Sequence, residues 1–290
     1  MERKKSFRQV LILILSGFII SGISIGQVPG QLDLNGKWKA TWNDGNHGPN
    51  DVEAFSGINP LNDTSRYMNV DVPMDLIVAM QKKGMVGDLN YGINYLSARW
   101  IAEQYWQYYK QFVVSKEISG KSVWLKFDRL DYSARIYLNG KLIGSHDNAF
   151  VPCLINVTGK LKEGINILTI GIESGLYDSA DKNLPDYNNS LNVHLNKRHW
   201  LRKPQYQFSW DWNPQLVNVG ITGDVSLIWR EAARLDNIVP WIKMTDDLSA
   251  ADVTIRAFIE GTKGSDGLTV EATLVETNQK VSGQIFTTNG

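Results

Sequence analysis

The sequence predicts an all-β protein built from two β-sandwich domains. Apolar and polar residues alternate along five stretches, which is typical of half-buried strands: residues 123–130, 134–144, 166–174, 224–230 and 252–261. Only one segment, residues 74–84, shows helical spacing. Many short strands without alternating helices or Gly-rich phosphate loops favour a sandwich over a parallel α/β sheet.

Composition excludes several protein classes. The chain has 290 residues, of which 43% are hydrophobic and 21% charged, with 25 Gly and 9 Pro, so disorder, collagen and coiled coils are ruled out. Thirty basic residues balance thirty acidic ones. Without the leader described next, 26 basic residues face 29 acidic ones, a net charge of about −3 that argues against a nucleic-acid partner.

Residues 1–26 have the pattern of a signal peptide. A basic segment, residues 1–9, precedes eleven apolar-rich residues, 10–20, and Ser24 and Gly26 stand where cleavage before Gln27 requires small side chains. The apolar run is shorter than the roughly 20 residues that span a bilayer, so an uncleaved anchor is the weaker alternative, and no later segment reaches that length. We expect a bacterial protein exported to the periplasm or beyond the cell.

The only cysteine, Cys153, cannot form an internal disulfide. Val, Pro, Leu and Ile flank it, so we expect a buried, unreactive thiol rather than a nucleophile.

Three local patterns specify elements of the first domain. Aromatic residues on two stretches predict core strands: Trp38, Trp42, Tyr105, Trp106, Tyr108 and Tyr109. In residues 74–84, Leu76, Ile77 and Met80 form one apolar helix face that ends at Gly84. The dipeptide Asn139-Gly140 takes positive φ readily, which makes residues 134–144 a tight hairpin.

A change in composition places the domain boundary near residue 231. Nine of the ten Trp lie at or before position 229, and the following residues are richer in Thr, Val, Asp and Gly. We therefore expect domains at residues 27–231 and 232–290. The second holds about four strand-like runs, whereas an immunoglobulin-like sandwich takes about 100 residues and seven strands. We expect this sandwich to be truncated; the alternative is a small four-stranded appendage.

The segment richest in possible chemistry is residues 197–214. It contains four cations, six aromatic residues counting His199, and one carboxylate, Asp211. In an extended chain Trp210 and Trp212 point to one face and Asp211 to the other. Sugars stack on indoles and need fixed polar groups for their hydroxyls, so this pattern suits a sugar site. The alternative is a structural role, with core tryptophans and an Asp that accepts hydrogen bonds from backbone or Arg.

Metal and cofactor sites are not expected. His194 and His199 are five residues apart in a predicted loop, a spacing that fits neither a helical metal pair nor a strand face. The remaining Asp and Glu are predicted to lie singly on solvent-facing surfaces.

Several separate motifs together resemble the N-terminal part of a glycoside hydrolase family 2 enzyme, closest to the β-mannosidases. They lie at residues 34–38 (LNGKW), 70–95, 102–114, 125–158 with its Leu-Asn-Gly hairpin and Asn-x-Phe turn, and 202–214 (RKPQYQFSWDWNP). Two positions depart from the pattern: residues 88–91 differ from the Asp-Pro-Tyr-like turn, and Asn213 replaces a glycine.

The resemblance implies a jelly-roll, galactose-binding-like domain, then an immunoglobulin-like sandwich, then a TIM barrel with two catalytic glutamates. The barrel is expected to lie outside these 290 residues, so none of them is predicted to be the catalytic acid or nucleophile. The family's use of this loop implies that Trp210, Asp211 and Trp212 bind substrate. Arg202 and Lys203 are further candidates, to orient Asp211 or cap the domain interface, with solvation or packing as their alternative.

The predicted function is therefore that of an exported, retaining β-mannosidase-like hydrolase. The full-length chain would act on β-mannoside oligosaccharides, and these residues alone would be inactive. Two alternatives stay open: a stand-alone, non-catalytic carbohydrate-binding module, and part of a family 2 β-galactosidase or β-glucuronidase, which share the same domain plan.

Overall fold

The computed structural model describes residues 30–44, 67–183, 198–209, 212–230, 233–261, 269–275 and 278–284. The chain divides into two compact units. One is Gly30–Trp229, which ends two residues before the predicted boundary, and the other takes in Arg230–Gly290. The predicted signal peptide, residues 1–26, lies outside the described residues.

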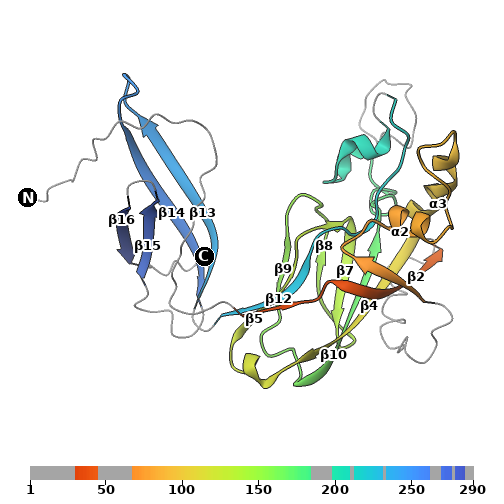
Figure 1. Cartoon of the computed structure of the whole chain (residues 1–290), viewed down its shortest axis with the longest axis horizontal. Helices are drawn as coiled ribbons and strands as arrows, with labels where there is room; N and C mark the ends of the chain where they lie inside the picture. Colours follow the sequence, from red (N-terminus) through yellow and green to blue (C-terminus); the bar gives the residue numbers. More distant parts are fainter. Residues whose placement is uncertain are drawn as a thin grey trace, which may run out of the picture. The chain divides into compact units, whose positions relative to one another are not determined.

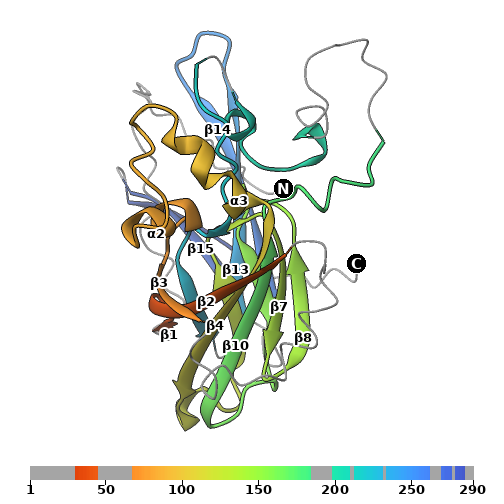
Figure 2. The ribbon, with the colours of Figure 1, turned by 90° about the vertical axis from the view of Figure 1, so that its right-hand side faces the viewer.

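The larger unit is a sandwich of two sheets (Figure 1). The six-stranded sheet has the order β3-β2-β4-β10-β7-β8. Its strands are β2 (Gly36–Asp44), β3 (Met68–Val72), β4 (Gln104–Val114), β7 (Ser133–Leu138), β8 (Lys141–His146) and β10 (Gly164–Glu173). In Figure 2 the strands β4, β10, β7 and β8 of this sheet lie side by side.

The second sheet has four strands in the order β1-β12-β5-β9. They are β1 (Gly30–Asp33), β5 (Ser122–Phe127), β9 (Cys153–Asn156) and β12 (Val225–Arg230). A separate short pair joins β6 (Leu130–Asp131) to β11 (Gly220–Ile221). The predicted strand at residues 123–130 is therefore interrupted, because Asp128 and Arg129 leave the sheet to bond the Thr222–Asp224 turn.

The core fills the space between the two sheets. Trp38 and Trp106 of the large sheet are buried with Phe127 and Leu227 of the small one. Each of these indoles also donates a hydrogen bond to a backbone carbonyl, Trp38 to Leu34 at 2.8 Å and Trp106 to Ile101 at 2.7 Å. The core roles predicted for Trp38, Tyr105, Trp106, Tyr108 and Tyr109 are confirmed, and Trp42 packs half-buried against Trp100 and Trp106.

The predicted helix is confirmed as α2 (Leu76–Lys82). It begins because the Asp75 carboxylate accepts a hydrogen bond from the Ile77 N–H at 2.7 Å. It ends where Gly84 takes a φ of 72°, a conformation that favours glycine. Its apolar face, with Leu76, Ile77 and Met80 buried, packs against the sandwich core.

The other helical segments in the described ranges were not predicted, because each is one turn or little more and too short to show periodicity. They are η3 (Asn94–Ala98), α3 (Arg99–Ala102), η4 (Lys116–Ile118), η5 (Arg198–Trp200) and η6 (Gln205–Phe208). In both views α2, α3, η5 and η6 lie at the same end of the sandwich (Figures 1 and 2).

The predicted hairpin joins β7 to β8 through Asn139 and Gly140, whose φ angles are 51° and 80°. This is the pair of positive φ values that a two-residue hairpin turn needs. The Asn139 side chain also ties the turn to β10, since its Oδ1 accepts from the Ile167 N–H at 3.0 Å and its Nδ2 donates to Asn166 at 2.9 Å.

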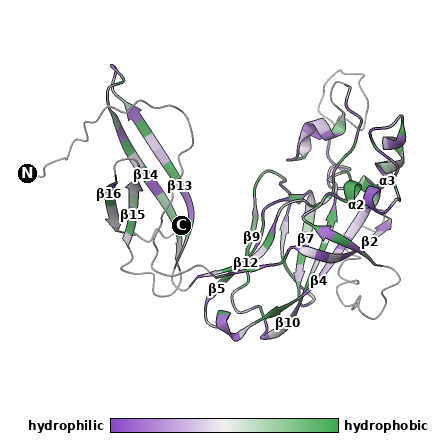
Figure 3. Cartoon of the chain, in the orientation of Figure 1, coloured by the Kyte–Doolittle hydropathy of each residue, from purple (hydrophilic) through white to green (hydrophobic). Residues whose placement is uncertain are grey.

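The second unit consists, in its described part, of two antiparallel strand pairs. They are β13 (Ala233–Met244) with β14 (Ala251–Gly261), and β15 (Thr269–Leu274) with β16 (Gln279–Gln284). Apolar and polar residues alternate along much of β14, whereas β13 contains the apolar run 238–242 (Figure 3). Register places Ile242 opposite Val253 and Ile238 opposite Ala257, so one face of this pair is apolar, as in one layer of a β-sandwich.

Cys153 is a buried, free cysteine, as predicted, and burial raises the pKa of its thiol to about 11. Among the residues that the structure describes, no helix has the length and apolar character needed to cross a membrane.

Candidate functional site

The described part of the segment that carries the predicted site lies at the same end of the sandwich as α2 and α3 (Figures 1 and 2). It begins with η5 and η6, and the Gln205 side-chain amide holds the first part together. Its Nε2 lies 3.1 Å from the Arg198 carbonyl oxygen, 3.3 Å from that of Leu201 and 3.2 Å from that of Lys203. The loop therefore carries its own internal hydrogen-bond network.

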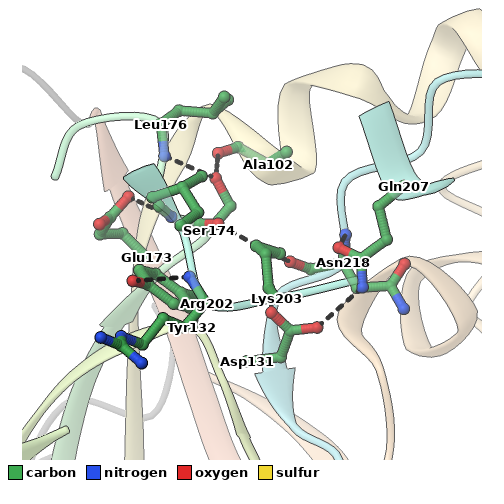
Figure 4. Close-up of polar contacts among 12 residues, drawn as sticks. Ala102, Asp131, Tyr132, Glu173, Ser174, Leu176, Arg202, Lys203, Gln207 and Asn218 are labelled. Atoms are coloured by element: carbon green, nitrogen blue, oxygen red, sulfur yellow. Dashed lines mark hydrogen bonds and ion pairs between the residues drawn. The ribbon is translucent and has the colours of Figure 1, made fainter. Parts of the chain in front are cut away.

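Lys203 points inward from this loop and its side chain is fully buried. Its Nζ lies 2.7 Å from Asp131 Oδ1, whose side chain is 5% exposed, and donates to the backbone oxygens of Ser174 and Asn218 at 2.7 and 2.8 Å (Figure 4). Burial lowers the pKa of Lys203, and the Asp131 carboxylate opposes that fall. Two backbone oxygens thus accept hydrogen bonds from the ammonium group, and the Asp131 carboxylate forms an ion pair with it.

Gln207 links the same carboxylate to the far end of the loop. Its Nε2 donates to Asp131 Oδ2 at 3.1 Å, and its Oε1 accepts from the Asn218 N–H at 3.1 Å. The Leu216 N–H donates to the Gln207 carbonyl oxygen at 3.1 Å. The chain leaves the sandwich after Gln207 and returns before Asn218, and both ends are bonded to each other and to the Lys203–Asp131 pair.

An apolar cluster lies beneath the loop. It contains Tyr132 from the end of β6, three loop side chains and two alanines: Ala102, Tyr132, Ala149, Leu201, Phe208 and Val217. The Tyr132 hydroxyl accepts from the Arg202 N–H at 3.2 Å, and the Ala149 N–H donates to the Arg202 carbonyl oxygen at 2.9 Å. The turn after β8 is the predicted Asn-x-Phe turn, and it fastens the start of the loop.

Glu173, the last residue of β10, and the following Ser174 lie next to this network. Glu173 is buried, and its carboxyl accepts from the N–H groups of Gly175 at 2.7 Å, Tyr177 at 3.2 Å and Asp178 at 3.3 Å. Burial nevertheless raises the pKa of Glu173 to about 7. Ser174 follows, with its carbonyl oxygen on Lys203 and its hydroxyl donating to the Ala102 carbonyl oxygen at 2.7 Å (Figure 4).

The predicted site residues fall in different places. Trp212 is described and its residue surface is 100% exposed. Trp210 and Asp211 lie outside the described residues. The described neighbours are Ser209, whose φ is 79°, and Asn213, whose carbonyl oxygen accepts from the Ser209 hydroxyl at 3.3 Å.

The two candidate cations differ sharply. Arg202 is exposed and its backbone is bonded to Tyr132 and Ala149. Lys203 is buried, with its ammonium committed to three oxygens of its own domain. The geometry therefore supports an internal role for Lys203 rather than a direct contact with substrate.

Sequence reasoning missed the partners of Lys203. The expectation that the remaining carboxylates lie on solvent-facing surfaces is wrong for Asp131 and Glu173, both of which are buried. The available signal for Asp131 was its position between two apolar residues, Leu130 and Tyr132. Nothing in the sequence marked Gln207 and Asn218 as partners of this pair, because Gln and Asn are common in loops of any function.

Within the described ranges, no group of three or more His, Cys, Asp or Glu side chains is arranged to hold a metal ion. His199 stacks near Trp200, with ring centroids 5.3 Å apart, and His194 lies outside those ranges.

Known proteins share this fold and parts of this sequence. The family model described as glycosyl hydrolase 2 galactose-binding domain-like matches residues 51–223. A β-mannosidase B from Emericella nidulans is 30% identical over 226 residues, covering 76% of this chain and 26% of that protein. A probable β-mannosidase from Caenorhabditis elegans is 28% identical over 195 residues, covering 62% of this chain and 22% of that protein.

Solved glycosidase structures superpose on most of this chain. The β-D-mannosidase from Dictyoglomus thermophilum superposes with a TM-score of 0.69 at 26% identity, over 88% of this chain and 30% of that one. A β-glucuronidase from an uncultured Clostridium gives a TM-score of 0.58 at 20% identity, over 89% and 38%, a likeness that shows the fold alone.

These comparisons bear out the predicted all-β fold with its galactose-binding-like sandwich and the resemblance to family 2 enzymes of the β-mannosidase type. The chain spans about a quarter of the length of the curated relatives it matches. Because the family model matches more than half of its residues, the chain belongs to glycosyl hydrolase family 2, with the larger sandwich as its galactose-binding domain-like region.

Proposed function

We propose that this chain supplies the galactose-binding-like domain of an exported β-mannosidase that removes terminal β-D-mannose from oligosaccharides with retention at the anomeric carbon. Trp210, Asp211 and Trp212 contribute to the subsite of the sugar whose bond is cut. The similarity to β-mannosidases from two eukaryotes and from Dictyoglomus thermophilum supports this choice of substrate.

The proposal rests on the exposure of the Trp212 side chain. Its surface is fully exposed, on a loop whose two ends are bonded to a buried ion pair. The exposed indole of Trp212 offers a large apolar face to a ligand, and the bonded ends of its loop place it at one end of the sandwich. The apolar face of a pyranose ring is a natural partner for that indole.

Asp211, next to Trp212 in sequence, supplies the polar half of the recognition. A carboxylate that accepts from sugar hydroxyls makes charge-assisted hydrogen bonds, and their loss in a water-poor pocket costs on the order of 2 kcal/mol. Arg202, exposed at the start of the same loop, is near enough in sequence to orient this carboxylate or to contact a neighbouring domain.

The catalytic carboxyls come from a separate barrel domain in this proposal. A retaining glycosidase needs two carboxyl groups about 5 to 5.5 Å apart that reach the scissile bond. The buried carboxyls of the sandwich cannot do this, because Asp131 is engaged by Lys203 and Gln207, and Glu173 by three backbone N–H groups. We therefore expect the 290-residue chain alone to be inactive.

Export rests on the leader pattern of residues 1–26, with its basic start, apolar centre and small residues before the cleavage site. A signal sequence delivers the enzyme to the bacterial periplasm or the medium, where oligosaccharide substrates are encountered.

The direct test uses purified residues 27–290 and p-nitrophenyl β-D-mannoside. We expect nitrophenol release at the rate of a buffer blank. A rate well above the blank would show a catalytic site inside these residues and would contradict the assignment of the chemistry to another domain.

The exposed Trp212 also suits a second function, a non-catalytic carbohydrate-binding module. Titration calorimetry of the same protein with mannobiose separates the two. Half of a subsite should give no measurable heat, whereas micromolar binding would favour the module. In the enzyme with its catalytic domain, hydrolysis of β-glucuronides or β-galactosides in preference to β-mannosides would replace the proposed sugar.

A further inference from the structure

We propose that Lys203, Asp131 and Gln207 are positioning residues that fix the loop carrying Trp212. This inference rests on the sugar-binding role proposed above, since the position of the loop matters to function only if the loop binds. It concerns side chains that touch no substrate themselves and act through the loop.

The Lys203–Asp131 ion pair lies at the base of the loop. Lys203 lies before the loop tip and Asn218 after it, and the Lys203 ammonium bonds the Asn218 carbonyl oxygen at 2.8 Å. The same ammonium forms an ion pair with Asp131 of β6 at 2.7 Å and donates a hydrogen bond to the Ser174 carbonyl oxygen, just after β10, at 2.7 Å. One cation therefore joins both ends of the loop to two separate parts of the sandwich.

Gln207 contacts the same two residues, Asp131 and Asn218, that Lys203 contacts. It bonds Asp131 Oδ2 and the Asn218 N–H, each at 3.1 Å, so Asp131 and Asn218 are each held by both loop residues. Four residues thus form a closed set of contacts around the base of the loop (Figure 4). A closed network that combines an ion pair with directional hydrogen bonds in a buried interior has few alternative arrangements.

A general stabilising role does not by itself account for the Lys203–Asp131 pair. A hydrophobic pair of similar volume stabilises an interior as well as an ion pair does or better, so an ion pair is a costly way to fill space. Directional bonds to Ser174, Asn218 and Gln207 specify where the chain leaves and re-enters the sandwich, which apolar contacts from the cluster around Phe208 do not.

The test is ¹⁹F NMR of the whole 290-residue chain labelled with 5-fluorotryptophan. The chain has ten Trp, and Trp212→Phe assigns the resonance of interest by its loss. In Lys203→Met we expect the Trp212 resonance to move by more than its line width while the resonances of Trp38 and Trp106, deep in the core, keep their positions. Ile170→Ala, which removes buried core volume on β10 away from the loop, is the control and should leave Trp212 in place.

A folded Lys203→Met chain with an unmoved Trp212 resonance overturns the inference, and so does an equal displacement in Ile170→Ala. If Lys203→Met fails to fold, Gln207→Met decides, because it removes two bonds and keeps the ion pair; an unmoved resonance there overturns the inference as well. These readouts need no sugar. Loss of the sugar-binding role, shown by unchanged turnover in Asp211→Ala, is therefore a separate result.

Discussion

The ammonium of Lys203 and the carboxylate of Asp131 lie 2.7 Å apart in the interior of the sandwich, with side-chain exposures of 0% and 5%. Neither charge has water to solvate it, so each depends on the other and on the hydrogen bonds from Gln207 and to Ser174 and Asn218. This pair connects the sheet framework to the loop with the family's tryptophan motif.

Lys203→Met should lower the free energy of unfolding by about 3 to 5 kcal/mol, because it leaves the Asp131 carboxylate buried without its counter-charge. Urea unfolding followed by circular dichroism measures the loss. The matched control is Lys126→Met, which breaks a pair of the same 2.7 Å length, with Asp128, at side-chain exposures of 38% and 42%. That change should cost less than about 1 kcal/mol, and equal losses in the two variants would contradict the assigned burial.

Glu173 should make the protein less stable as pH rises from about 4.5 to 7. Its pKa in the folded chain is about 7, against 4.5 for a free side chain, so between these values the unfolded chain releases a proton that the folded chain keeps. Rising pH then favours the unfolded state. Melting temperatures across this range should fall less steeply in Glu173→Gln; identical slopes in the two proteins would show that Glu173 ionises normally.

Gly140→Ala should destabilise the sandwich by about 1 to 2 kcal/mol, since its φ of 80° brings a Cβ too close to the following carbonyl oxygen. Asparagine tolerates this region, so Gly140→Asn is the control and should lose much less. Denaturant midpoints measured on both variants test the turn, and an Ala variant as stable as wild type would be inconsistent with it.

Cys153 should not react with Ellman's reagent in the native protein. Its thiol is buried and its pKa is raised to about 11, so both access and thiolate are lacking. Full colour should appear only after addition of denaturant. A Cys153→Ser/Ser145→Cys protein, with its thiol at an exposed position on β8, is the control and should react at once.

Local chemistry explains what the sequence could predict. The Asn139-Gly140 hairpin, the helix that ends at Gly84 and the aromatic core strand around Trp106 each depend on neighbours a few residues away. The Lys203–Asp131 pair joins residues far apart in the chain, and no local pattern marks a buried lysine. Short segments such as α3 were missed because one helical turn has no periodicity to detect.

The resemblance to a family motif contributed more to the prediction of the sugar site than composition did. An Asp between two Trp suits both a core and a sugar site, and only the similarity to β-mannosidases favours the second for Asp211. The fold alone leaves this choice open, because β-glucuronidases share it.

The sugar-binding role proposed for Asp211 can be measured as kcat/KM for p-nitrophenyl β-D-mannoside in the enzyme that carries this domain together with its catalytic domain. Asp211→Ala should lower that value about tenfold or more, equivalent to at least 1.4 kcal/mol of transition-state stabilisation. Asp128→Ala, at an exposed carboxylate, should leave it unchanged. An Asp211→Ala enzyme with the kcat/KM of wild type would contradict the account and leave the Trp210-Asp211-Trp212 motif with a structural role only.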